Sequence, residues 1–414
     1  MSDLIERPAT PAMGLGAAPP VTGHVVAVIG QNENGILRES ASRFMELLRP
    51  LGVAGHVLDL FRPDWPATLD ALLQERVLFA WGPAGVGAHL PLEGGNLWDA
   101  LRVPFISVLA DHPCIMPRNH HVPALHVANG YMVPDWLAVQ RSLIRAPQLS
   151  GILPLGVLPN PHRDAIPWRD RPHRMVFVKT GSDPEAWRRR WADFPARIRA
   201  VLEESSEAAL HGWPREVTEA VSEAAEGQGL WLEGRPEALF GLCYEVDTYV
   251  RDVRSTALAR ALLHLPAVIH GRGWEHLAGQ ATRARFLPAL DAALLPTLYA
   301  ESGFVLNTSP NFTRGIHERV VNGFASGACV VSDANPVMEE RFSGLPSFFG
   351  VDVMDPDLPD RLAALFHDTT DRGDAVRPAA ELAARDFDAM GFMQGLIGMA
   401  HEIRLLSGFE AFLA

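Results

Sequence analysis

Residues 303–335 read GFVLNTSPNFTRGIHERVVNGFASGACVVSDAN. The apolar run 304–306 is typical of a buried parallel strand. Apolar residues spaced along 316–326 predict a helix, and Gly327 stands where a helix commonly ends in a left-handed residue. The apolar run 328–332 predicts a second buried strand, which ends on Asp333. Together these segments predict a strand–loop–helix–strand unit.

The loop before the predicted helix is rich in polar residues. Arg314, His317 and Arg319 cluster around Gly315. The start of a helix offers free backbone N–H groups and the positive end of the helix dipole, so this junction could bind an anion. An ordinary crossover in an α/β sheet is the alternative interpretation.

Composition limits the classes of protein to consider. A chain of 414 residues suggests two domains, and 48% hydrophobic with 21% charged residues is typical of globular proteins. A net charge of −13 argues against a nucleic-acid-binding surface. Three scattered cysteines favour a reducing, cytoplasmic location, and no run is long enough for a membrane span. The first 20 residues lack the apolar core of a signal peptide and are interpreted as a disordered tail.

The first half alternates strands with helices. Predicted strands cover 24–30, 55–60, 77–81, 104–109 and 151–155, and predicted helices cover 36–48, 68–74, 95–101 and 135–144. This alternation predicts a parallel sheet with helices on both faces. Ligands of such sheets bind beyond the carboxyl ends of the strands, which directs attention to three loops: 31–35, 82–87 and 110–121.

Two of these loops carry candidate chemistry. The loop 82–87, GPAGVG, could bind phosphate, although a plain turn is the favoured interpretation. Asp111 and His112 follow a buried strand and could serve as a general base or orient an acceptor. Further along, Cys114 and His120, His121 and His126 make a metal site conceivable, but their spacing matches no common zinc pattern. A surface loop without a function is also possible.

A proline-rich segment separates the two halves. We predict a tail over 1–20, a first domain over 21–157, a linker over 158–173, a second domain over 174–390 and a final helix over 391–414. The second domain repeats the alternation, with strands at 174–179, 267–270, 286–288, 304–306, 328–332 and 347–351. Residues 184–265 are largely helical and are expected to flank this sheet. Lys179 and Thr180 end a strand and could contact a diphosphate, or could form an ordinary exposed strand end.

Four motifs of the second half occur in a recognisable order. These are GRGWE at 271–275, LNTSPN at 306–311, GIHER at 315–319 and ASGACVVSD at 325–333. In this order they resemble the C-terminal half of CgeB-like glycosyltransferases of the GT-B fold. The resemblance covers about 175–342, and the first half is similar in outline only. It implies two doubly wound, Rossmann-like parallel sheets facing a central cleft, with a C-terminal helix that crosses back to the first domain.

The resemblance also implies transfer of a sugar from a nucleotide-sugar donor, without a metal or other cofactor, to a glycan, lipid-linked sugar or protein such as flagellin. The donor base would lie near Gly271–Trp274, and its diphosphate near Lys179, Thr180 and the helix after Gly315. The candidate catalytic residues are Asp111, His112 and His317. The candidate donor-binding residues are Lys179, Thr180, Gly271, Gly273, Trp274, Asn311, Arg314, Gly315, Glu318, Arg319 and Asn322.

The sequence departs from the family at one point. Related enzymes often carry two glutamates eight residues apart, and these places fall near Arg314 and on Asn322. Asn322 could still bind a ribose hydroxyl, and Glu318 could instead cap the helix. This departure supports a non-catalytic nucleotide-sugar-binding partner protein as one alternative. A nucleotide-sugar epimerase of the same two-domain plan, which would use similar phosphate contacts, is the other.

Overall fold

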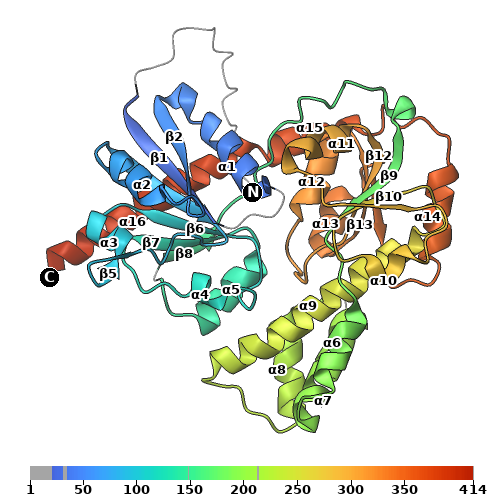
Figure 1. Cartoon of the computed structure of the whole chain (residues 1–414), viewed down its shortest axis with the longest axis horizontal. Coiled ribbons are helices and arrows are strands. Elements are labelled where there is room, and N and C mark those ends of the chain that lie inside the picture. The colour runs from blue at the N-terminus through green and yellow to red at the C-terminus, as the bar shows by residue number, and fades with distance from the viewer. Residues whose placement is uncertain (1–20, 31–34, 148, 212–213, 414) are drawn as a thin grey trace, which may run out of the picture.

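The computed structural model describes residues 21–30, 35–147, 149–211 and 214–413. The predicted tail 1–20 and all but the last residue of the predicted loop 31–35 lie outside the described residues. Figure 1 shows two α/β domains side by side, with a group of helices projecting from the second domain. No helix in the described part of the chain combines the length and apolarity that crossing a bilayer requires.

The first domain is built on a parallel sheet of six described strands in the order β2-β1-β3-β6-β7-β8. The strands are β1 (Gly23–Ile29), β2 (Val53–Asp59), β3 (Val77–Pro83), β6 (Phe105–Leu109), β7 (Val127–Tyr131) and β8 (Leu149–Ile152). Around them lie α1 (Ile36–Glu46), η2 (Arg49–Leu51), α2 (Trp65–Leu73), the hairpin β4 (Pro91–Leu92) and β5 (Gly95–Asn96), α3 (Leu97–Leu101), α4 (Pro117–His120) and α5 (Pro134–Leu143). The predicted alternation is confirmed, and the sequence missed β7 and α4.

The second domain repeats this plan with the strand order β11-β10-β9-β12-β13-β14, again all parallel. Its strands are β9 (His173–Val178), β10 (Val268–His270), β11 (Arg285–Leu287), β12 (Ser302–Asn307), β13 (Cys329–Asp333) and β14 (Phe348–Val351). Its helical segments are η3 (Trp168–Asp170), α10 (Glu275–Ala278), η4 (Ala292–Leu294), α11 (Leu295–Ala300), α12 (Glu318–Ala325), α13 (Pro336–Phe342), α14 (Leu358–His367) and α15 (Arg377–Asp386).

The unit β12–α12–β13 forms as the sequence predicts. Helix α12 begins two residues later than expected, because His317 caps it and is not part of it. Gly327 takes φ 64°, the left-handed conformation expected after a helix. Val320, Val321 and Phe324 of α12 are fully buried against Val330 of β13, so the helix packs on the sheet and its N-terminus lies at the carboxyl end of β12.

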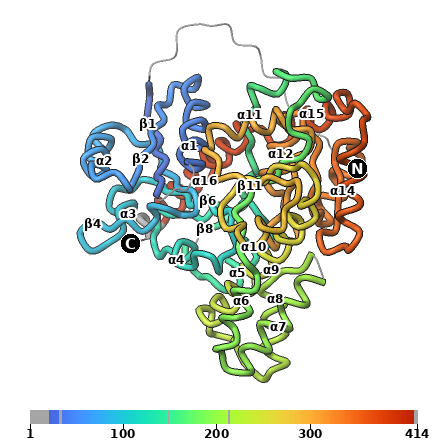
Figure 2. Tube along the Cα trace, turned by 45° about the vertical axis from the view of Figure 1, so that its right-hand side comes forward, coloured from blue at the N-terminus to red at the C-terminus, as the bar shows by residue number. Residues whose placement is uncertain are grey.

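Residues 184–261 depart from the prediction. We expected their helices to flank the second sheet, but α6 (Pro184–Trp191), α7 (Ala196–His211), α8 (Val217–Gly227) and the first half of α9 (Pro236–Ala261) form a helical arm with its own core. The arm projects away from the sheet (Figures 1 and 2). Of these helices, only the end of α9 packs on the sheet, at Leu258 and Ala259. The core of the arm also takes in Cys114, Val139 and Ile144 of the first domain, so the arm joins the two domains.

The last helix, α16 (Ala389–Leu413), crosses back to the first domain as predicted. Its buried side chains pack on the face of the first sheet that α1 also covers, among Val25, Ile29 and Trp81. These side chains are Phe392, Met393, Leu396, Met399, Ala400 and Ile403. A Cβ on Gly130 would lie 3.2 Å from the sulfur of Met399, so the helix approaches the sheet closely.

Candidate functional site

The backbone around Lys179 is held in place by two glycines. A Cβ on Gly271, at φ 151°, would lie 1.9 Å from the carbonyl oxygen of Lys179, and one on Gly273, at φ 79°, would lie 2.0 Å from that of Gly181. The indole N–H of Trp274 donates to the same Lys179 oxygen at 2.9 Å. These contacts fix the chain where β9 ends and explain why the segment 271–274 needs its glycines.

The side chain of Trp274 lies in the core and not on the surface of the second domain. Its side chain is 2% exposed and packs in the core of the second domain against Phe177 and Phe286, with Gly181 close to its ring. A buried ring cannot stack on a nucleotide base. The geometry therefore assigns Trp274 to the support of Lys179, and the contact of Gly271 and Gly273 with a donor stays a prediction.

Lys179 itself carries the clearest electrostatic signal in the site. It is the only lysine in the whole sequence, in which the other cationic side chains are arginines and histidines. Burial, followed by the charges of Arg319 and Arg251, lowers the pKa of its ammonium to about 8. Within the described chain, this ammonium makes no hydrogen bond or ion pair, so an anion could bind it directly.

The N-terminus of α12 lies within electrostatic reach of Lys179. His317 is the cap: its Nδ1 accepts the backbone N–H of Arg319 at 3.1 Å. Burial first, and then Arg319 and Lys179, hold the pKa of His317 well below its ordinary value, so its ring is neutral and its Nε2 carries a proton to donate. The Glu318 carboxylate accepts its own backbone N–H, and its side chain is 57% exposed. An anion of the protein thus already occupies the positive end of this helix.

Arg319 is oriented from the end of β12. Its Nη1 donates to the Asn307 side-chain oxygen at 2.6 Å, and Asn307 in turn donates to Ser332 at 2.9 Å. Asn322 lies one turn after Glu318 on the same face of α12 and is half-buried, and its predicted contact with a ribose stays a prediction. Thr180, next to Lys179, is exposed.

Three predicted donor-binding residues have other partners. Arg314 pairs with Asp135 of the first domain at 2.7 Å, and the backbone N–H groups of Thr313 and Arg314 donate to the same carboxylate. The Asn311 amide donates to Asp247 of α9 at 3.0 Å. Gly315 packs on the ring of Phe312, where a Cβ would lie 2.9 Å away. These contacts tie the loop 308–315 to its neighbours, which argues against a direct role in donor binding.

The sequence analysis did not identify two arginines of α9 that lie near the site. Arg251 approaches Asp247 at 2.8 Å and donates to Asp111 at 3.1 Å, and although burial alone would lower its pKa, these carboxylates raise it. Arg254, which is 1% exposed, pairs with Asp333 at the end of β13. The spacing of 247, 251 and 254 on one helical face was a possible signal, but it resembles an ordinary surface ion-pair pattern.

Asp111 and His112 have different surroundings. Asp111 lies at the junction between the domains with its side chain 45% exposed and paired with Arg251. His112 is fully buried: its Nε2 lies 2.9 Å from a Glu216 oxygen, and its Nδ1 accepts the backbone N–H of Cys114. Because both ring nitrogens are engaged, the contacts of His112 favour a structural link to the arm over the catalytic role that we predicted.

The described histidines of the first domain have partners other than a metal ion or are exposed. His120 is buried against the hydroxyl of Tyr131 at 2.7 Å, His126 approaches Asp99 at 3.2 Å, and His121 is exposed. Among the described residues, no group of histidine, cysteine, aspartate or glutamate side chains is arranged to hold a metal ion. The loop 82–87 closes on itself, because a Cβ on Gly82 would lie 2.0 Å from the carbonyl oxygen of Val86, as expected of a tight turn.

Six side chains thus come together where the two domains meet: Asp111, Lys179, Arg251, His317, Glu318 and Arg319, here called the junction cluster. The charges of Arg319, Arg251, Glu318 and Asp111 all act on Lys179. Asp111 follows β6 of the first sheet, and Lys179 follows β9 of the second. The cluster therefore lies at the carboxyl ends of strands from both sheets, where such folds bind ligands.

Comparison with known proteins agrees with this architecture. Residues 253–389 match a family model described as "Glycosyl transferase-like". The solved structure of sucrose-phosphate synthase from Thermosynechococcus elongatus is 10% identical, with a TM-score of 0.50 over 94% of this chain and 100% of that one. An α-glucosyltransferase in complex with UDP-glucose and DNA containing an abasic site is 8% identical, with a TM-score of 0.50 over 91% and 99%. HepE of Anabaena, in complex with UDP-glucose, is 12% identical, with a TM-score of 0.46 over 92% and 99%. A search of curated protein sequences gives no match.

The family match covers the second domain from the end of α9 to the start of α16, and the structural matches cover both sheets. The CgeB-like subfamily stays a prediction. The chain thus has the two-domain GT-B fold, and residues 253–389 of its second domain are similar to a family described as glycosyl transferase-like.

Proposed function

We propose that this protein transfers a sugar from a nucleoside diphosphate sugar, and that Lys179 and Arg319 hold the diphosphate. The observation that carries the proposal is the lone lysine of the chain, which lies at a strand end beside two arginines and has no hydrogen-bond or ion-pair partner among the described residues. Arg251 is engaged by the carboxylates of Asp247 and Asp111, whereas Lys179 and Arg319 form no ion pair with a carboxylate among the described residues. These two cations are the ones that we propose to bind the diphosphate.

The chemistry follows from where charge develops. When the bond between the sugar and the diphosphate breaks, negative charge grows on the leaving phosphate. Fixed cations and donors that face this charge stabilise the transition state more than the ground state. The Lys179 ammonium, the Arg319 guanidinium and the Nε2–H of neutral His317 are suited to this role, and we propose that they act without a metal.

The remaining residues are assigned by position. Asp111 is the partly exposed carboxylate that the first domain contributes, and we propose that it faces the acceptor and orients or deprotonates its hydroxyl. Glu318 and Asn322 share one face of α12, and we propose that they meet the ribose or the sugar. For a phosphate to reach the start of α12, the Glu318 carboxylate would have to leave its own N–H.

The acceptor and the cellular location belong to the same proposal. A glycan, a lipid-linked sugar and a protein such as flagellin are the acceptor classes to test. The three cysteines are free and buried, which fits a reducing compartment, so we place the protein in the cytoplasm.

A thermal-shift screen against UDP, GDP, CMP, dTDP and their common sugars, without added metal, tests donor binding. UDP sugars come first, because the α-glucosyltransferase of similar fold was solved with UDP-glucose. A ligand at a hundred times its Kd adds about 2.7 kcal/mol of stability. Lys179→Ala and Arg319→Ala should each abolish the shift while the fold is retained. The matched control is Arg260→Ala, which removes an exposed arginine of α9 and should leave the shift unchanged.

Product analysis with the same donor then separates the functions. A transferase releases nucleoside diphosphate in proportion to acceptor, an epimerase converts the donor sugar without acceptor, and a binding protein does neither. Nucleotide binding that survives both substitutions would remove the diphosphate assignment.

A further inference from the structure

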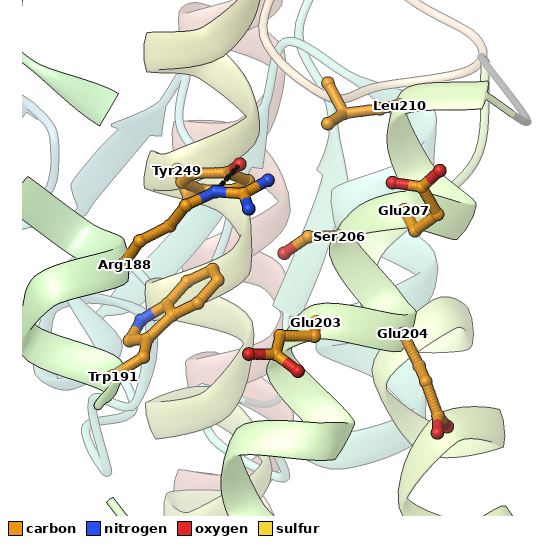
Figure 3. A pocket seen from close by; sticks show the side chains of 8 residues that line it. All are labelled: Arg188, Trp191, Glu203, Glu204, Ser206, Glu207, Leu210 and Tyr249. Carbon is orange, nitrogen blue, oxygen red and sulfur yellow. Dashed lines mark hydrogen bonds between the residues drawn. The ribbon is translucent and has the colours of Figure 1, made fainter. Parts of the chain in front are cut away.

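A hollow of about 380 Å³ lies in the helical arm, where α6, α7 and α9 meet (Figure 3). Its lining includes Arg188 and Trp191 of α6, Glu203 and Ser206 of α7, and Tyr249 of α9. Tyr249 and Arg251 are two residues apart on α9, so they point about 200° from each other around the helix. The hollow therefore lies on the side of α9 that faces away from the junction cluster.

The hydroxyl of Ser206 has no partner in the described structure. Ser206 is 3% exposed, and its Oγ makes no hydrogen bond. Its neighbour Ser205 satisfies its own hydroxyl by donating to the Val201 carbonyl one turn earlier. In Figure 3 the Ser206 hydroxyl points into the space between Tyr249, Trp191 and Glu203. Since a buried hydroxyl without a partner is costly, a ligand with donors and acceptors of its own would fit here.

The opposite wall presents fixed polar and aromatic groups. The Arg188 Nε donates to the Tyr249 hydroxyl at 2.8 Å. This bond fixes the guanidinium group, and its other N–H groups are left to donate to a ligand. Trp191 packs on Tyr249 with ring centroids 4.8 Å apart, and its indole N–H is held by Glu245 at 3.0 Å. These contacts preorganise one donor group and two aromatic rings before any ligand binds.

The charge of the hollow is negative. Three carboxylates, from Glu203, Glu204 and Glu207, line it against the single guanidinium of Arg188. His211 approaches Glu207 at 3.0 Å and Gln228 donates to Glu204 at 2.7 Å, whereas the nearest cation to Glu203 is Arg199 at 3.9 Å. Glu203 is therefore the carboxylate most available to a ligand. The described carboxylates do not converge as a metal shell would require, so separate hydroxyl or ammonium groups suit them better.

We propose that this hollow is a carbohydrate-binding site, with a preference for amino sugars over neutral sugars and for neutral sugars over uronic acids. A sugar ring offers several hydroxyls to Ser206, Glu203 and Arg188, and apolar C–H edges to the aromatic rings. The volume lies in the usual range of ligand pockets. The site binds a sugar apart from the place of transfer. Its role in holding a distant unit of a glycan acceptor rests on the proposed function, whereas the binding itself does not.

Saturation-transfer NMR on the full chain, with glucosamine, glucose and glucuronic acid as probes, tests the site without any donor. We expect Kd values in the order glucosamine, glucose, glucuronic acid, from tightest to weakest. Ser206→Ala should weaken the binding of glucosamine and glucose by about three- to tenfold, the effect of one lost hydrogen bond. The matched control, Ser205→Ala, removes a hydroxyl that is satisfied within α7, and should leave binding unchanged.

A second pair of variants tests the charge preference. Glu203→Gln should weaken glucosamine binding by a larger factor than glucose binding, and Glu226→Gln, at an exposed position of α8 outside the hollow, should change neither. Saturating UDP should leave the signals in place, because the hollow and the junction cluster lie on opposite sides of α9. The proposal is overturned if no saccharide binds, if Ser206→Ala leaves binding intact, or if UDP displaces the probes. A failed transfer assay with intact saccharide binding would count against the proposed function alone.

Discussion

The lone lysine allows the electrostatics of the junction cluster to be measured directly. Burial and the charges of Arg319 and Arg251 lower the pKa of Lys179 from 10.5 to about 8. Only the neutral amine attacks an aldehyde reagent. At pH 7.5 about a quarter of the Lys179 side chains would be neutral, against about one in a thousand for an ordinary lysine. The reactive fraction should therefore be larger by about two orders of magnitude.

The assay is labelling with pyridoxal 5′-phosphate, followed by borohydride reduction and mass spectrometry. The tryptic segment 175–188 contains the only lysine that can be labelled, and the α-amino group is found in a different peptide. We expect the labelling rate to rise with pH with a midpoint near 8. Affinity for a nucleoside diphosphate should fall over the same range, because only the ammonium form attracts an anion.

Two perturbations should move this midpoint upwards. Saturating nucleotide should raise it and slow the labelling, because a bound diphosphate favours the ammonium form. Arg319→Ala should raise it as well, because it removes the largest charge repulsion that acts on Lys179. A midpoint above pH 10 in the wild type, or labelling that is insensitive to nucleotide, would refute both the reasoning about Lys179 and its place in the site.

Three further outcomes test the surroundings of the cluster. Asp135→Ala should destabilise the contact between the domains by about 3 kcal/mol, seen as faster amide exchange at residues 313–314, whereas Arg314→Ala, at a side chain 58% exposed, should cost less than about 1 kcal/mol. Equal effects of the two substitutions would contradict the role of the Asp135 carboxylate in holding residues 313–314 to the first domain. His112→Ala should lower the melting temperature strongly and leave the kcat of the folded fraction near the wild-type value. A large loss of kcat without a loss of stability would instead support the catalytic role that we first predicted for His112. Gly273→Ala should cost about 2 kcal/mol or more and weaken nucleotide binding, since its methyl would meet the Gly181 oxygen, and unchanged denaturation by urea would argue against the support given to Lys179.

The sequence predicted the two sheets well, because buried parallel strands appear as apolar runs separated by helices. It missed β7, whose residues Asn129 and Gly130 are unfavourable in strands, and whose connection from β6 contains only the short helix α4. It also treated the helical arm as a layer on the sheet. Amphipathic helices show that one face is buried but not what covers it, and here they bury their apolar faces against one another.

The sequence predicted where the residues of the site lie along the chain, but not which side chains they contact. Strand and helix ends can be located from local patterns, so the positions of Lys179, Asp111, His317 and Arg319 were accessible. The partners of a polar side chain are decided by tertiary contacts. Sequence reasoning therefore could not show that His112 meets Glu216, that Arg314 meets Asp135, or that Arg251 reaches Asp111.

The return of α16 to the first sheet has a consequence for how the chain is made. On the ribosome, strands β1 to β8 emerge more than two hundred residues before the helix that covers one of their faces. During that interval, apolar side chains such as Val25 and Trp81 lack the cover of residues 392–403, and an exposed face of this kind promotes aggregation. The second domain has no such delay, since its sheet and covering helices are complete by residue 386. The domain that begins the sequence is therefore the one that finishes folding last, and a chain shortened by its final helix would lose the first domain before the second.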